Sequence, residues 1–154
     1  MLRQYLVGAA TSVGNIAIHA LFMAVVIRVA RFADDQATQH PSIRLIAIMS
    51  ATVIVLMFAH LAEVLVWSFV YAAVDAAPAD ADLVYFAFVN YTTLGYGDVT
   101  PVARWHLIGP MTAMNGVLLF GWSTAVIFEV LRMTLLENGD GDEAKKRERR
   151  WGPE

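Results

Sequence analysis

The stretch Thr92-Thr93-Leu94-Gly95-Tyr96-Gly97-Asp98 decides the fold, because two glycines separated by one residue do not continue a helix. It follows an apolar and aromatic segment, residues 83–93, which is too short to cross a membrane. Asp82 stands before that segment as a suitable helix N-cap, and Pro101 ends the loop. We therefore predict a half-length helix over residues 82–93, followed by a glycine-containing loop.

Long apolar blocks lie on both sides of this loop. They cover about residues 5–30, 43–74 and 105–136, and each is long enough for a membrane-spanning helix, which needs about 20 residues. Of the 154 residues, 58% are apolar and 16% are charged, whereas soluble domains carry about 25% charged residues. The sequence predicts an all-α membrane protein with three transmembrane helices. A re-entrant helix and loop are predicted between the second and third of them.

The loop has the residues needed to bind a dehydrated cation. A cation crossing a membrane must exchange its water for oxygens at matched distances, and backbone carbonyls pointing at one axis supply them. Such a backbone needs glycine at alternating positions, as at Gly95 and Gly97. Tyr96 can be wedged between neighbouring side chains, and the hydroxyl of Thr93 adds oxygens at the inner end. A chance match to this pattern is below about one in a thousand, given average glycine and tyrosine usage.

The loop resembles the selectivity filter of the potassium channel family, which has the signature TVGYG, with Leu94 here in place of valine. The resemblance runs over roughly residues 80–132 and implies a filter at residues 93–97. By this likeness, K⁺ is coordinated by the carbonyl groups of Thr93, Leu94, Gly95 and Tyr96, with Gly97 completing the filter. One filter strand per chain implies a homotetramer, because four copies must surround the ion.

The same likeness assigns roles around the filter. The residues expected to support it are Thr92, Asp98, Tyr85, Phe86 and Asn90. Many family members have a tryptophan pair where this chain has Tyr85 and Phe86, and some have a glutamate where it has Val89, so the bracing of the filter is expected to differ. The residues expected at the gate or cavity are Gly116, Phe120, Gly121, Thr124 and Asn115. Two questions stay open, namely whether Gly116 is a hinge or permits close packing, and whether Asn115 lines the cavity or bonds behind the filter.

The predicted organisation is a single membrane domain without internal repeats. Its parts are an extra N-terminal helix (1–31), a cytoplasmic connector (32–42), a pore domain (43–136, with outer helix 43–74, pore helix 82–93, filter 93–97 and inner helix 105–136) and a charged cytoplasmic tail (137–154).

The distribution of basic residues predicts the orientation. If the connector and the tail are cytoplasmic, nine of the eleven Lys and Arg residues lie inside, and only Arg3 and Arg104 lie outside. This places the N-terminus outside and the C-terminus in the cytoplasm of a multi-pass cell-membrane protein. It also gathers four acidic residues at the outer mouth, where negative charge concentrates cations: Asp75, Asp80, Asp82 and Asp98. A cleaved signal peptide at the N-terminus is an alternative, but the charge distribution opposes it.

Three ionisable residues lie within the predicted spans. His19 is near the middle of the first, and His60 and Glu63 share one face of the second. Such groups are costly in a membrane and often functional. They can form a pH sensor, a metal pair with too few ligands for a firm site, or a hydrogen-bonded network that fixes the extra helix.

The function predicted from these observations is passive, selective K⁺ conduction. The expected partners are three further copies of the chain, membrane lipids and K⁺ as the permeant ion. No nucleic acid, cofactor or enzymatic activity is expected, since no nucleophile–base cluster or metal triad is evident. The alternatives are a weakly selective Na⁺/K⁺ channel, a nonconducting accessory or transporter subunit, and a proton or divalent-metal carrier built on the histidines.

Overall fold

The computed structural model describes residues 1–34 and 41–151, and it describes side chains for residues 1–28 and 42–136. Within that part of the chain all regular structure is helical. The elements are α1 (Leu2–Asp34), α2 (Pro41–Val74), α3 (Leu83–Tyr91), the short 3-10 helix η1 (Ala103–Trp105) and α4 (Ile108–Trp151).

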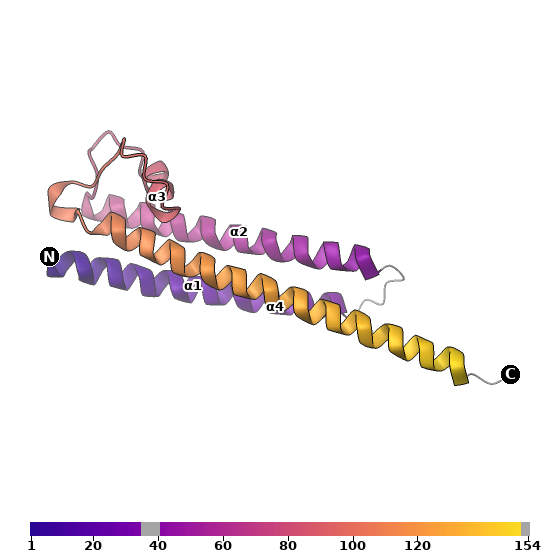
Figure 1. Ribbon diagram of the computed structural model, residues 1–154. Helices are drawn as coiled ribbons and strands as arrows, with labels where there is room; N and C mark the ends of the chain where they lie inside the picture. Colours follow the sequence, from indigo (N-terminus) through magenta and orange to yellow (C-terminus); the bar gives the residue numbers. More distant parts are fainter. Residues whose placement is uncertain (35–40, 152–154) are drawn as a thin grey trace.

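Three long helices run side by side, and the short helix α3 sits with its loops at one end of the bundle (Figure 1). Three segments are long and apolar enough to cross a membrane, namely Leu2–Arg28, Ser42–Val74 and Ala103–Leu136. The chain is therefore an all-α, multi-pass membrane protein with three spanning helices, as the sequence predicted. The N-terminus lies at the same end of the bundle as α3, and α4 continues away from it (Figure 1).

Helix α1 packs against both α2 and α4. Away from α3, this packing buries an apolar cluster of Met23, Val26, Ile48, Leu56 and Val130. A second cluster lies at the α3 end and includes Trp67, Tyr71, Phe86, Trp105 and Ile108. The second cluster fixes α3 against the bundle and so positions the loop that follows it.

Helix α3 begins as the sequence predicted. The side chain of Asp82 accepts hydrogen bonds from the backbone N–H groups of Val84 (3.0 Å) and Tyr85 (3.1 Å). These bonds satisfy two of the N–H groups that a helix leaves unpaired at its start. The helix ends at Tyr91, directly before the glycine-containing loop.

The helix ends differ from the predicted boundaries in three places. Part of the predicted connector is helical, since α1 continues to Asp34 and α2 starts at Pro41, where the fixed φ of proline suits a first helical turn. Residues 35–40 of that connector lie outside the described residues. Helix α4 starts at Ile108 rather than 105, because η1 occupies residues 103–105.

The predicted tail is also different. Helix α4 runs on to Trp151 instead of ending near residue 136. Residues 143–150 are rich in Glu, Ala, Lys and Arg, which are strong helix formers, and this accounts for the extension. The side chains of the basic run at 145–150, and residues 152–154, lie outside the described part of the chain.

Candidate functional site

The backbone of residues 93–97 alternates in handedness. Thr93, Gly95 and Gly97 have φ values of 60°, 62° and 81°, and the two residues between them do not share this positive φ. Glycine adopts such values freely, but a β-branched threonine rarely does, and the conformation is costly for it by roughly 1–3 kcal/mol. A local structure must therefore hold Thr93 in place.

The end of α3 supplies that structure. The N–H of Thr93 donates to the carbonyl of Asn90 at 3.0 Å, and the N–H groups of Leu94 and Gly95 donate to the carbonyl of Val89 at 3.0 and 3.4 Å. The hydroxyl of Thr92 donates to the carbonyl of Phe88 at 2.7 Å. These bonds satisfy carbonyls that the helix would leave free, and they join the strained segment directly to α3.

A hydrogen bond joins the far end of the segment back to α3. The hydroxyl of Tyr85 donates to Asp98 Oδ2 at 2.7 Å, and both side chains are exposed. This bond lowers the pKa of Asp98 and raises the pKa of Tyr85, because it favours the charged carboxylate and the neutral phenol. Tyr85 and Asp98, two of the predicted supporting residues, are thus brought together.

The other predicted supporting residues on α3 face the bundle. Phe86 is buried, with its ring 4.9 Å from that of Tyr71 on α2. The amide of Asn90 donates to the hydroxyl of Tyr71 at 3.3 Å, and that hydroxyl is 2.6 Å from the hydroxyl of Thr112 on α4. A short chain of hydrogen bonds therefore connects α3, α2 and α4 behind the loop.

Gly116 allows close contact between α4 and the end of α3. A Cβ atom placed on this glycine would lie 2.0 Å from the carbonyl oxygen of Tyr91 and 3.0 Å from its carbonyl carbon. Backbone atoms cannot move aside as a flexible side chain can, so any larger residue here must displace one of the two helices. The structure thus gives Gly116 a packing role, whether or not the helix also bends there.

The other predicted gate or cavity residues do not share one environment. Gly121 and Thr124 are exposed in the single chain, and the Thr124 hydroxyl donates to the carbonyl of Phe120 at 2.9 Å. The side chain of Asn115 is buried within the chain, whereas the sequence left open whether it lines the cavity or bonds behind the filter. Its Oδ1 accepts from Asn15 Nδ2 on α1 and from Trp67 Nε1 on α2, both at 3.0 Å.

The three ionisable residues of the spans lie together in the interior. His19 Nδ1 on α1 is 2.7 Å from Glu63 Oε1 on α2, and both side chains have no exposed surface. His60 Nδ1 is 3.2 Å from Glu63 Oε2. Asn15 Nδ2 donates to the backbone carbonyl of Glu63 at 3.3 Å. Helix α1 is therefore attached to α2 through polar groups in an apolar region.

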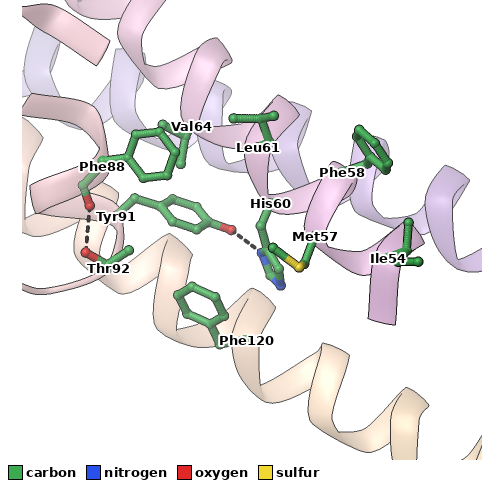
Figure 2. Close-up of a pocket in the computed structure, with 10 residues that line it drawn as sticks. All are labelled: Ile54, Met57, Phe58, His60, Leu61, Val64, Phe88, Tyr91, Thr92 and Phe120. Carbon is green, nitrogen blue, oxygen red and sulfur yellow. Dashed lines mark hydrogen bonds between the residues drawn. The ribbon is translucent and has the colours of Figure 1, made fainter. Parts of the chain in front are cut away.

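This polar cluster reaches the end of α3. The hydroxyl of Tyr91 donates to Glu63 Oε2 and also lies 2.9 Å from His60 Nδ1. Figure 2 shows Tyr91 pointing toward His60, at the wall of a hollow of about 520 Å³ between α2, α3 and α4. Phe120 lines the same hollow, with its ring 4.4 Å from that of His60. Tyr91 is the residue directly before Thr92, so its side chain joins the cluster to the part of the chain that leads into the 93–97 segment.

Several residues of this network were not singled out from the sequence as site residues. They are Asn15, Trp67, Tyr71, Tyr91, Thr112 and Ser123. Asn15 and Ser123 could have been predicted as buried contacts, because polar side chains within a span tend to face protein. Tyr91 and Trp67 could not, because aromatic residues are common throughout the spans.

Comparison with known families gives one result. A family model described as "Ion channel" matches residues 42–133, which include α2, α3, the glycine-containing loop and most of the spanning part of α4. Helix α1 lies outside the match. No curated protein and no solved structure matched the chain.

Proposed function

The chain belongs to the ion channel family, and from this premise we propose that it is the pore-forming subunit of a potassium-selective channel. In this proposal K⁺ moves passively down its gradient across the cell membrane. Conduction of this kind needs no catalytic group and no cofactor. Residues 93–97 form the filter, with K⁺ bound by the carbonyl oxygens of Thr93, Leu94, Gly95 and Tyr96.

The proposal rests on the alternating handedness of the backbone at Thr93, Gly95 and Gly97. In an ordinary strand, neighbouring peptide units face opposite ways. A left-handed residue at every second position reverses every second unit, so successive carbonyls can face the same side. A row of carbonyls on one side is what replaces the hydration shell of a permeating ion.

A single chain supplies only one wall of such a passage. Leu94 and Tyr96 are 53% and 69% exposed, so their own chain leaves more than half of the surface of each residue uncovered. Closed rotational symmetry provides both the missing walls and cover for this surface. We therefore propose a homotetramer, in which neighbouring copies pack around Tyr96 and four filter strands surround the ion.

The position of α3 supports cation conduction. Its C-terminal end leads into the segment at Thr92, and the end of a helix carries a partial negative charge. In a tetramer, four such ends would face the inner side of the filter. The positive-inside rule places this end of the bundle, and the N-terminus beside it, on the outer side of the membrane.

The direct test is ion flux into liposomes that contain the purified full-length chain. We expect K⁺ uptake that barium blocks and that exceeds Na⁺ uptake by at least about tenfold. The matched variants are Gly95→Ala, at a φ of 62°, and Gly14→Ala, where the added methyl group has no neighbour within 4 Å beyond the adjoining backbone of its own helix. Flux should be lost in the first variant and retained in the second.

Other outcomes identify the alternatives. Equal Na⁺ and K⁺ uptake would replace the proposal with a weakly selective channel. A folded tetramer without flux would indicate a nonconducting accessory or transporter subunit.

A further inference from the structure

Three potential metal ligands converge where α1, α2 and α4 pack together, beside the end of α3. The ligand atoms of His19, His60 and Glu63 all lie within 4.8 Å of one another. Both imidazoles turn Nδ1 toward the carboxylate, at 2.7 Å for His19 and 3.2 Å for His60. In a tetrahedral zinc site with bonds of about 2.0–2.1 Å, neighbouring ligand atoms lie about 3.3 Å apart. Small side-chain movements therefore make room for an ion among these atoms.

Ser123 on α4 contacts the opposite edge of both rings. Its Oγ lies 2.9 Å from His60 Nε2 and 3.4 Å from His19 Nε2. A hydroxyl oxygen has two acceptor lone pairs, so it can accept an N–H from each ring. In that pair of tautomers, both Nδ1 atoms carry a lone pair directed toward Glu63. An outer contact of this kind is what orients histidine ligands in metal sites.

The charge of the cluster also favours a cation. Glu63 is completely buried in a spanning helix, and its ion-pair partners among the described residues are the two histidines. With both imidazoles neutral, the cluster has a net negative charge in an apolar region, which is costly. The hydroxyl of Tyr91 contacts Glu63 and His60, and its oxygen could serve as a fourth metal ligand beside the two nitrogens and the carboxylate.

We propose that His19, His60 and Glu63 form a binding site for one divalent transition-metal ion of the zinc type. Two histidines and one glutamate are an established ligand set for zinc, and imidazole nitrogen suits this class of metal better than Mg²⁺ or Ca²⁺. A bound ion would join α1 to α2 directly beside Tyr91, which precedes the proposed filter segment in the chain. This site is additional to the proposed K⁺ conduction and does not depend on the selectivity of the pore.

The test is the metal content of the full-length chain, expressed in zinc-supplemented medium and purified in detergent. A His40→Gln/His106→Gln chain is the control, because it removes the other two histidines and leaves His19 and His60. We expect about one zinc per chain in the parent and the control, and at least tenfold less in His19→Gln and His60→Gln. Cobalt in place of zinc should give the visible absorption of a tetrahedral site in the parent and the control only.

A parent chain without zinc, or zinc that persists in both His19→Gln and His60→Gln, would overturn the proposal. The cluster would then be a proton-bearing structural network. If these variants do not fold, Ser123→Ala keeps all the ligands and should bind zinc about 10–100-fold more weakly. In that case a second measurement on the parent chain tests the site. Zinc that is added back after chelation should raise the unfolding temperature of the parent, because a ligand that binds the folded state stabilises it. If the unfolding temperature does not rise, the site is refuted.

Discussion

The hydrogen bond from Tyr85 to Asp98 joins the far end of the proposed filter segment to the first turn of α3. We predict that Tyr85→Phe changes how the proposed channel responds to external pH. The bond lowers the pKa of Asp98, so in the parent this carboxylate stays charged at a pH where an ordinary aspartate would already be protonated. Without the donor the pKa rises, and negative charge at the mouth is lost at a higher pH.

The measurement is K⁺ flux as a function of external pH. The midpoint of the acid-side decline should lie at higher pH in Tyr85→Phe than in the parent. Tyr5→Phe, a change at an exposed position on α1, removes a hydroxyl elsewhere and serves as the control. Superimposable profiles for all three chains would show that this bond does not control the charge of Asp98.

Gly116 is the second residue from which a sharp prediction follows. Alanine here would place a methyl group 2.0 Å from the carbonyl oxygen of Tyr91, so α4 and α3 must move apart. We expect Gly116→Ala to destabilise the folded state by about 1–3 kcal/mol, as overpacking does. Thermal unfolding in detergent should show this loss.

Gly14→Ala is the matched control for this experiment. It also replaces a glycine in the middle of a spanning helix, but beyond the adjoining backbone of its own helix no atom lies within 4 Å of the added methyl group. It should be neutral or stabilising, because alanine favours helix. If Gly116→Ala is as stable as Gly14→Ala, the close approach of α4 to α3 is not a constraint on the fold.

Helix α1 is held to its neighbours by polar contacts as well as apolar ones. Asn115 accepts hydrogen bonds from Asn15 on α1 and Trp67 on α2. Asn115→Leu would leave both donors buried without that acceptor, at about 1–3 kcal/mol for each. We predict a lower unfolding temperature and faster proteolysis of α1.

Thr124→Val is the control for this substitution, since the Thr124 hydroxyl bonds only to a carbonyl of its own helix among the described contacts. It should have a small effect on both measurements. Equal effects of the two substitutions would mean that Asn115 contributes nothing specific to the docking of α1.

The sequence predicted the elements better than their contacts. Block length identified the three spans, and Asp82 together with the two glycines identified α3 and its loop. The packing faces could not be predicted, because apolar residues surround each spanning helix and leave no clear stripe. The convergence of His19 with Glu63, or of Asn15 with Asn115, depends on helix rotation, which spacing along one helix does not determine.

Two parts of the site differ in how far the sequence predicted them, for physical reasons. The sequence left two placements open for Asn115, because a polar residue in a span can be satisfied by a water-filled cavity or by another helix. In the structure its side chain bonds to Asn15 and Trp67 on two other helices. The loop at residues 93–97, by contrast, could be singled out from the sequence because a left-handed conformation at alternating positions restricts the residues that fit. The φ values of Gly95 and Gly97 explain why that motif is so informative.

The molecule as a whole combines a matched region, residues 42–133, with one additional helix. Helix α1 covers the buried polar groups of α2 and α4, and Tyr91 connects the same cluster to the filter segment. Support for the proposed filter therefore extends through α3 and α2 to α1. Leu94 and Tyr96 are exposed in the single chain, at the segment where the proposed tetramer would bring in other copies.

Removal of α1 tests this arrangement. A chain that starts at Pro41 after a new methionine would expose Glu63 and Asn115 to lipid. Glu63 would keep His60 and Tyr91 but lose His19, and a carboxylate that faces lipid is unfavourable. We predict that it yields little tetramer on size-exclusion chromatography or native mass spectrometry. Adding Glu63→Gln and Asn115→Leu should recover at least part of the tetramer, since glutamine is uncharged and still accepts from Tyr91, and leucine tolerates lipid. If the shortened chain assembles fully without these substitutions, α1 does not act by covering polar groups.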